Sequence, residues 1–584
     1  MGLSGLEVFF RFLCLIIPAA LRELPIITIP GQGKIRGVEL SKVRIQKITA
    51  YYGIPYAQPP IGNLRFAPPV TEPLPDWDDT MNNTDFKPSC IQDKADYKQS
   101  ELPFYQLLSE DDFPTNVSED CLYLNVFVPN TSPPPGGFAT IVWIHPGNFT
   151  TGLLSIWNPH TLVYRQNVII VTFAWRLSIL GFFTTMDAGA PGNNGLKDQQ
   201  AAMKWVKNNI NQFQGNPDNI CIMGYGTGAT SAGIHMINVE SKKLFNKAIL
   251  MSGSLFQLSP IRFPQDIRPE LDYLVEQFGC GGRETATILS CLRVPQAENL
   301  VKHTTNFNWR PNIDKGLSNV SLDFFPELPK IAFDNNENAK IPVLTGYTNM
   351  EQALEIEDFD NTTLYSPDTL KQLISDFVSG ELPNTNDTDE YCPKYTSLVV
   401  EDIATKFVVE KNYAAPTVLL ASYLSRDQPT FVYRFDMKPS SQIANKNLPS
   451  WVKVPHLFDL LYVWGVPYWK TDQREWDLRD RDRADIVMSF WTNFAKTDNP
   501  TQNSRYPIKW DSFKKEMPGL LIWDNNIYMS DPKTVNYKCY EFWNEYYPKT
   551  LHLAHEYCQQ SDSPKTFRLY NITLLFAFFS LRFF

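Results

Sequence analysis

The segment Ile220-Cys-Ile-Met-Gly-Tyr-Gly-Thr-Gly228 decides which fold the sequence predicts. Its four leading apolar residues indicate a buried strand, and residues 229–238 after it are typical of a helix. A strand, a sharp turn flanked by glycines and a helix together form the nucleophile elbow, G-x-S-x-G, whose central serine attacks the substrate. Here the central residue is Gly226, which has no side chain.

Two other interpretations of these glycines have to be weighed. Gly224-x-Gly226-x-x-Ala229 satisfies the dinucleotide-binding fingerprint G-x-G-x-x-G/A after a strand. That fingerprint also needs an acidic residue about twenty positions further on, at a strand end, and the sequence offers none there. A structural turn without chemistry is the third interpretation, and the rest of the chain has to decide among the three.

Other apolar runs surround this segment. Residues 140–144, 168–173 and 248–251 indicate further buried strands, and residues 198–210 indicate an amphipathic helix. The apolar face of that helix consists of Ala202, Trp205, Val206 and Ile210. Strands that alternate with helices favour a mostly parallel sheet covered on both faces, so the predicted fold class is α/β.

Composition bounds the domain organisation and the partners. The chain has 584 residues, of which 43% are hydrophobic and 20% charged, which is typical of a globular protein. We find no linker, charge block or repeat that would divide it, and predict one large domain. The net charge of −10, without any Lys/Arg-rich stretch, argues against a nucleic-acid partner. The seven histidines do not cluster and no CxxC pair occurs, so we expect neither a metal site nor a cofactor.

The N-terminus indicates export. Residues 1–20 contain an apolar run at 12–17 behind Arg11 and end in small residues, which is typical of a cleaved secretory signal. Sequons for N-glycosylation support export. They occur at Asn82, Asn116, Asn130, Asn148, Asn319, Asn361, Asn386 and Asn571. We therefore expect a secreted protein, or one on the extracellular face of the plasma membrane.

The C-terminus ends in an apolar tail. Residues 569–584 are too short for a comfortable membrane span, which needs roughly 20 apolar residues. Small residues at Ser561-Asp-Ser563, a polar stretch and this tail resemble a GPI-anchor signal, although Arg582 interrupts the tail. The predicted organisation is a signal at 1–20, a domain at 21–560, and a tail at 561–584 that would attach the protein to a membrane or is merely apolar.

Several long motifs elsewhere identify a family. They include Tyr52-Gly-Ile-Pro-Tyr-Ala-Gln-Pro-Pro60, Glu119-Asp-Cys-Leu-Tyr-Leu-Asn-Val126 and Gly192-Asn-Asn-Gly-Leu-Lys-Asp-Gln199. In this order they closely resemble the carboxylesterase/cholinesterase family, the type B carboxylesterases, over residues 27–545. The resemblance implies an α/β-hydrolase fold and selects the nucleophile elbow among the three interpretations of the glycines.

The resemblance also implies a Ser–His–Glu triad. The serine position falls on Gly226, the acid position on Glu351 in Gly346-Tyr-Thr-Asn-Met-Glu351, and the histidine position on His456 in Val454-Pro-His456. Glu351 would orient His456, and His456 would deprotonate a hydroxyl that Gly226 does not have. Without a nucleophile, the retained pair is also explained as a satisfied buried polar pair.

The oxyanion loop departs from the family pattern as well. The family has His-Gly-Gly-Gly-Phe where this chain has His145-Pro-Gly-Asn-Phe149. Gly147 is kept, but Pro146 has no N–H to donate to an oxyanion, and Asn148 adds a side chain. Thr227 takes the third donor position. Because this loop is buried in the family, we expect the Asn148 sequon to stay unglycosylated; the candidate acceptors are Asn82, Asn116, Asn130, Asn319, Asn361 and Asn386.

The resemblance further implies disulfides and a class of function. It pairs Cys90 with Cys121 and Cys280 with Cys291, and suggests Cys392–Cys539 as a third bridge. Some family members without the serine are cell-surface adhesion or recognition proteins, which implies a catalytically deficient protein with an extracellular or cell-surface protein partner. Two alternatives remain: an ester hydrolase with residual activity or an unusual nucleophile such as Thr227 or Ser231, and a carrier of a small apolar ligand.

Overall fold

The structure, a computed structural model, describes most of the chain. The described residues are 25–42, 46–93, 116–257, 261–282, 284–317, 323–353, 409–446, 448, 452–469, 476–546 and 549. Several predicted features lie outside them: the signal at 1–20, the tail at 561–584, Cys392, Cys558, Asn319, Asn361, Asn386 and Asn571.

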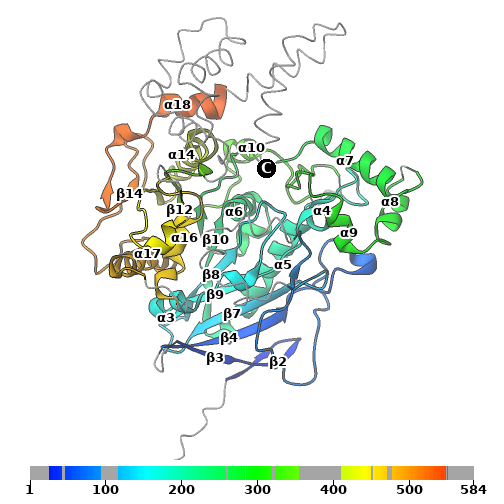
Figure 1. Cartoon of the computed structure of the whole chain (residues 1–584), viewed down its shortest axis with the longest axis horizontal. Helices are drawn as coiled ribbons and strands as arrows, with labels where there is room; N and C mark the ends of the chain where they lie inside the picture. The colour runs from blue at the N-terminus through cyan, green and yellow to red at the C-terminus, as the bar shows by residue number, and fades with distance from the viewer. Residues whose placement is uncertain are drawn as a thin grey trace, which may run out of the picture.

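One sheet of eleven strands organises the molecule (Figure 1). Its order is β15-β14-β13-β12-β11-β10-β8-β9-β7-β4-β3. The strands are β3 (Val38–Lys42), β4 (Gln46–Pro55), β7 (Tyr123–Pro129), β8 (Phe138–Ile144), β9 (Ile169–Phe173), β10 (Gly215–Tyr225), β11 (Lys247–Met251), β12 (Val343–Thr348), β13 (Thr430–Phe435), β14 (Leu521–Trp523) and β15 (Tyr528–Met529). From β14 through β9 every neighbouring pair is parallel, and the pairs at the two edges are antiparallel. The predicted mostly parallel sheet and its α/β class are confirmed.

Helices cover both faces of the sheet (Figure 1). One face carries α5 (Asn194–Asn209) and α6 (Thr227–Ile237), with α4 (Ser178–Phe182), α7 (Pro264–Gln277), α8 (Thr285–Leu292) and α9 (Ala297–Lys302) at its side. The other face carries α3 (His160–Gln166), α16 (Phe458–Val463) and α17 (Leu478–Thr497). Four more helices are α10 (Pro329–Asp334), α14 (Ala415–Leu424), α15 (Gln442–Asn445) and α18 (Tyr537–Glu541).

The strands alternate between the two cores because successive side chains point to opposite faces. In β8, Val142 packs in the core beneath α5 and α6, whereas Trp143 packs in the core on the other face. There its ring centroid lies 5.1 Å from that of Trp157 and 5.2 Å from that of Trp464. β11, the other neighbour of the elbow strand β10, alternates in the same way. Because these strands are buried on both faces, a site forms at their carboxyl ends.

Two of the three disulfides that the resemblance suggested are present. Cys90 is bridged to Cys121 and Cys280 to Cys291. Cys539 is also disulfide-bonded, and its partner lies outside the described residues, so the bridge to Cys392 stays a prediction. Cys221 on β10 is a buried free thiol.

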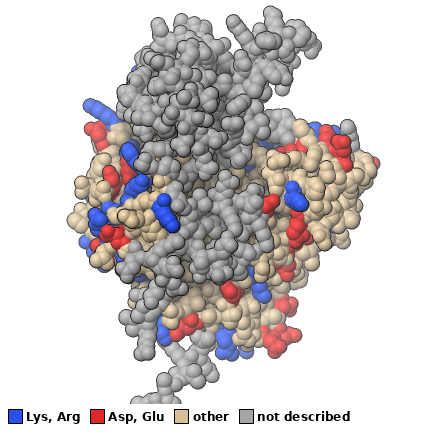
Figure 2. Space-filling view, viewed as in Figure 1, with Lys and Arg blue, Asp and Glu red and all other residues tan. Residues whose placement is uncertain are grey.

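The described surface mixes charges of both signs. On the face in Figure 2, basic and acidic side chains are interspersed instead of gathering into a single-sign patch. Among the described residues, no helix is both long enough and apolar enough to cross a membrane.

Candidate active site

Gly226 occupies the apex of the turn between β10 and α6. Its backbone has φ 53° and ψ −120°, its N–H donates to Met251 O at 2.8 Å, and its carbonyl accepts from Thr230 N at 3.0 Å. These two hydrogen bonds hold the turn against β11 on one side and against the first turn of α6 on the other. The elbow geometry is thus complete apart from the side chain.

The flanking glycines are required by close packing. A Cβ at Gly224 would lie 2.2 Å from Gly228 O, and a Cβ at Gly228 would lie 2.2 Å from Ile144 O. Both distances are below any real contact, so a side chain at either place would separate β10 from the start of α6 or α6 from β8. The sequence pattern Gly-x-Gly-x-Gly therefore records the packing of the elbow.

The site has room for a side chain at position 226. A Cβ built on Gly226 would lie 3.4 Å from His456 Nε2 and 3.9 Å from Pro146 Cβ, which are ordinary contact distances. A Cβ placed there would therefore lie in contact with the imidazole.

His456 and Glu351 form a pair beside this position. The Nδ1 of His456 is hydrogen-bonded to Glu351 Oε2, and the other carboxylate oxygen, Oε1, accepts from Thr348 N at 2.8 Å. Glu351 is fully buried, just beyond the end of β12, whereas the His456 side chain is 26% exposed. The structure thus brings Gly226, His456 and Glu351 together in the order of a triad.

Tyr225 holds the histidine segment in place, which the sequence analysis missed. Its hydroxyl accepts a hydrogen bond from Leu457 N at 2.7 Å, and its ring packs edge-on to His456 with centroids 4.8 Å apart. Tyr225 is the residue before Gly226, so the elbow and the histidine segment are joined directly. Its place inside the elbow motif was the only signal in the sequence.

Asp459 is a second missed residue, on the first turn of α16. Its carboxylate accepts from the Tyr433 hydroxyl at 2.9 Å and is completely buried. Burial, with the nearby charge of Glu351 as the next cause, raises the pKa of Asp459 to about 7. A second carboxyl group, which was not predicted, therefore lies close enough to Glu351 and His456 to interact with their charges.

The loop that follows β8 makes a tight turn. Gly147, Asn148 and Phe149 have positive φ angles of 125°, 53° and 62°. A Cβ at Gly147 would lie 2.1 Å from Thr151 O, so only glycine fits there, and the Gly147 carbonyl accepts from Thr151 N at 2.8 Å. Pro146, at the start of this turn, contributes no donor to the site.

His145 holds the loop in place. The ring is fully buried, stacks on Trp175 with centroids 4.9 Å apart, and its Nδ1–H donates to Pro146 O at 2.7 Å. Burial lowers the pKa of His145 to about 4, so the ring is neutral at physiological pH.

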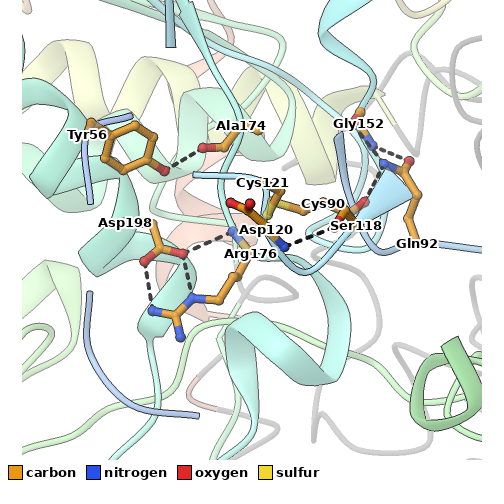
Figure 3. The surroundings of a disulfide bond; sticks show 10 residues. All are labelled: Tyr56, Cys90, Gln92, Ser118, Asp120, Cys121, Gly152, Ala174, Arg176 and Asp198. Carbon is orange, nitrogen blue, oxygen red and sulfur yellow. Dashed lines mark hydrogen bonds and ion pairs between the residues drawn. A yellow bond between two sulfur atoms is a disulfide. The ribbon is translucent and has the colours of Figure 1, made fainter. Parts of the chain in front are cut away.

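The chain beside the Cys90–Cys121 disulfide is hydrogen-bonded to Gly152, which directly follows this loop (Figure 3). Gln92, two residues after Cys90, donates to Gly152 O at 2.9 Å and accepts from Gly152 N at 2.8 Å.

A cavity of about 10 Å³ beside Cys90 and Arg176 has room for about one water molecule and no ligand.

Asn148 departs from expectation. The family's loop suggested a buried side chain, but Asn148 is exposed while Gly147 and Phe149 on either side are buried. The reversal follows from the turn, because the positive φ angles direct Phe149 into the core and leave Asn148 at the surface. The physical reason for expecting Asn148 to stay unglycosylated is therefore absent.

The two nearby hydroxyls differ in their surroundings. Ser231 is fully buried on α6 and its Oγ accepts from Gln199 Nε2 of α5 at 3.4 Å. The Thr227 Oγ1 is buried and makes no hydrogen bond within the part of the chain that the structure describes. An activated nucleophile needs an adjacent base, and among the described residues neither hydroxyl is hydrogen-bonded to one.

The described residues hold no group of three or more His, Cys, Asp or Glu side chains that could bind a metal ion.

Comparison with known proteins agrees with this arrangement. The sequence profile described as "Carboxylesterase family" matches residues 23–543. The chain is 30% identical to an acetylcholinesterase from Bungarus fasciatus over 567 residues, which cover 92% of this chain and 88% of that protein. It is 28% identical to a cholinesterase from Mus musculus (89% and 87% covered) and to carboxylesterase 1C from Rattus norvegicus (84% and 90% covered). The chain therefore belongs to the carboxylesterase family.

Proposed function

We propose that this protein is a catalytically deficient member of the carboxylesterase family that acts outside the cell as a recognition or adhesion protein. One observation carries the proposal: position 226, which faces His456 Nε2 across a contact distance, is a glycine.

The chemistry of the triad supports the loss of catalysis. His456 is oriented by Glu351 as a base, but the elbow presents no hydroxyl for it to deprotonate. Removing a triad serine costs on the order of 10⁶ in turnover, and what remains comes from binding and the oxyanion hole. The oxyanion loop also departs from the family pattern, at Pro146 and Asn148. Changes at two parts of one catalytic apparatus, the elbow and this loop, favour redirected function over chance.

Export supports the extracellular half of the proposal. The apolar N-terminal segment at 1–20 is typical of a secretory signal. Three of the predicted glycosylation acceptors, Asn82, Asn116 and Asn130, are exposed. Family members without the serine supply the class of function, namely adhesion or recognition by the folded domain.

Catalysis is tested by a fluorophosphonate probe and by hydrolysis of short acyl esters. We expect the purified full chain to give no covalent adduct and no turnover under conditions in which an active relative gives both. A stoichiometric adduct mapped to Thr227, Ser231 or another residue near the elbow would contradict the proposal and support an esterase with an unusual nucleophile.

Recognition is tested on cells. We expect the full chain to reach the surface or the medium, and proximity labelling there to enrich one cell-surface protein over a secreted control of similar charge. Retention inside the cell would contradict the proposal. A lipid or metabolite that co-purifies with the protein in stoichiometric amount would instead support a carrier of a small apolar ligand.

A further inference from the structure

We infer that Asn148 carries an N-linked glycan that covers the elbow of the lost active site. The inference rests on the proposed export of the chain, because N-glycans are added in the secretory pathway. It assigns a modification to a loop that the family resemblance alone would leave bare.

The acceptor has both the sequence and the exposure that a glycan needs. Asn148-Phe-Thr150 is an N-x-S/T sequon, and the Asn148 side chain is exposed. Among the described residues Asn148 makes no side-chain hydrogen bond, in contrast to Asn130, whose Oδ1 accepts from Thr49 Oγ1 at 2.6 Å. The Asn148 amide can therefore be modified without breaking a contact.

The turn holds Asn148 outward firmly. Phe149 is fully buried, with its ring centroid 5.1 Å from that of Phe182 and 6.2 Å from that of Trp175. The Gly147 carbonyl accepts a hydrogen bond from Thr151 N at 2.8 Å, which closes the turn. With both neighbours fixed in the interior, the side chain between them points to solvent, and the loop need not open to accept a bulky group.

The glycan root would lie close to the elbow. Pro146 Cβ is 3.9 Å from the position of a Cβ on Gly226, and Asn148 follows Pro146 by two residues, so their Cα atoms are at most about 7.6 Å apart. Gly226 and His456 are both partly exposed, so solvent reaches the elbow. A glycan is bulky and hydrophilic, and one rooted here stands where an ester substrate would approach.

Occupancy is tested by glycopeptide mass spectrometry of the full chain secreted from animal cells. Thr150→Ser keeps the sequon, and Thr150→Ala destroys it while leaving Asn148 in place. We expect a glycan on Asn148 in the wild type and in Thr150→Ser, and the loss of one glycan-sized step in Thr150→Ala. Asn116, which is exposed, serves as the reference sequon: a bare Asn148 beside an occupied Asn116 overturns this inference alone, whereas a chain without any glycan overturns the proposed export as well.

Whether the Asn148 glycan covers the elbow is tested by the reactivity of a thiol placed at position 226. Gly226→Cys is combined with Thr150→Ser or Thr150→Ala, and each is treated with a bulky thiol reagent. Cys221 stays silent because it is buried and burial raises its pKa to about 12. We expect faster labelling when the sequon is destroyed, and the same acceleration after enzymatic removal of glycans from the Thr150→Ser protein. Equal rates in all three samples overturn the covering role.

Discussion

At the scale of single residues, position 226 has room for a side chain and lies beside the base His456, but its glycine supplies no nucleophile. Because a Cβ there makes only ordinary contacts, the hydroxyl of Gly226→Ser would lie beside His456 Nε2. We expect Gly226→Ser to form an organophosphate adduct slowly, measured by intact mass, and the matched control Gly226→Ala to form none. The ester turnover of Gly226→Ser should remain at least about 100-fold below that of an ordinary family member, since the loss of one oxyanion donor lowers turnover by a factor of about 10²–10³.

The oxyanion loop should limit that variant further. In a Thr150→Ala background, which leaves no sequon at Asn148, adding Pro146→Gly and Asn148→Gly restores the backbone freedom and one N–H, so combining these changes with Gly226→Ser should give faster ester turnover than either set of changes alone. Family-level turnover by Gly226→Ser without the loop changes would contradict the role given to Pro146 and Asn148.

The positions of single functional residues were predictable where the residues lie within a recognisable motif. Gly226, Glu351 and His456 each lie in a short segment whose neighbours are recognisable, so their positions could be read from the chain. Tyr225 and Asp459 act through contacts with Leu457 and Tyr433, which only the folded chain brings near. The exposure of Asn148 depends on three successive positive φ angles, which the sequence does not specify.

At the scale of elements, the start of α16 contains a carboxyl group whose charge opposes folding. The pKa of Asp459 is raised from 3.8 to about 7 by burial and by Glu351, while His456 and the Tyr433 and Tyr225 hydroxyls face it with the opposite effect. The unfolded chain ionises first, so Asp459 lowers the free energy of unfolding progressively as the pH rises from about 4 to about 7. Asp459→Asn, which keeps an acceptor for Tyr433, should therefore gain stability relative to wild type over this range in urea titrations. A difference independent of pH would contradict the raised pKa.

A disulfide joins the turn after α7 to α8. Cys280–Cys291 closes a short loop (sequence separation 11), and a loop of this size contributes somewhat under about 3 kcal/mol by the chain-entropy model. We expect the double variant Cys280→Ser/Cys291→Ser to lose stability by up to that amount in thermal melts, and Cys221→Ala to leave the disulfide map unchanged. A free Cys280 or Cys291 thiol in non-reducing peptide mapping of the wild type would contradict the pairing.

Element boundaries were less predictable than element types. The elbow strand was expected at 220–223 and runs over Gly215–Tyr225, because its first residues pair with β8 across a register shift that no apolar pattern marks. The amphipathic helix was expected at 198–210, and α5 begins earlier, at Asn194. There Asn193 adopts a left-handed conformation (φ 58°), and its side chain donates to Asn312 O at 2.8 Å, a contact distant in sequence.

At the scale of the whole molecule, a buried ion pair joins separate parts of the fold (Figure 3). Arg176, after β9, makes two side-chain hydrogen bonds of 2.8 Å to Asp198 on α5 and donates to Ala67 O at 2.7 Å. Both charged side chains are almost fully buried. Asp198→Asn leaves the guanidinium uncompensated, and we expect a loss of about 3–5 kcal/mol in the free energy of unfolding from urea titration. A loss below 1 kcal/mol would mean that water reaches the pair.

The sheet as a whole was only partly predictable. Its parallel centre follows from apolar runs such as 140–144 and 248–251, which are buried on both faces. The antiparallel edges, β3 with β4 and β14 with β15, were missed. β3 and β15 are partly exposed, β14 is buried but only three residues long, and the ten residues of the largely buried β4 include Gln46, Lys47, Thr49 and Gly53, which interrupt its apolar pattern.

The conformation of Gly226 makes the loss of the serine difficult to reverse. With φ 53° and ψ −120°, the elbow holds a backbone shape that an L-residue with a side chain adopts only at a cost of about 1–3 kcal/mol. An active esterase accepts that cost in exchange for its nucleophile, whereas the glycine here removes it. Gly226→Ala should therefore lower the thermal stability even though its methyl group fits, and an unchanged melting temperature would refute this. Under the proposed function, an exchange of serine for glycine at this position gains stability in the same step that removes hydrolysis, and a return to serine begins with a less stable protein that does not yet hydrolyse esters efficiently.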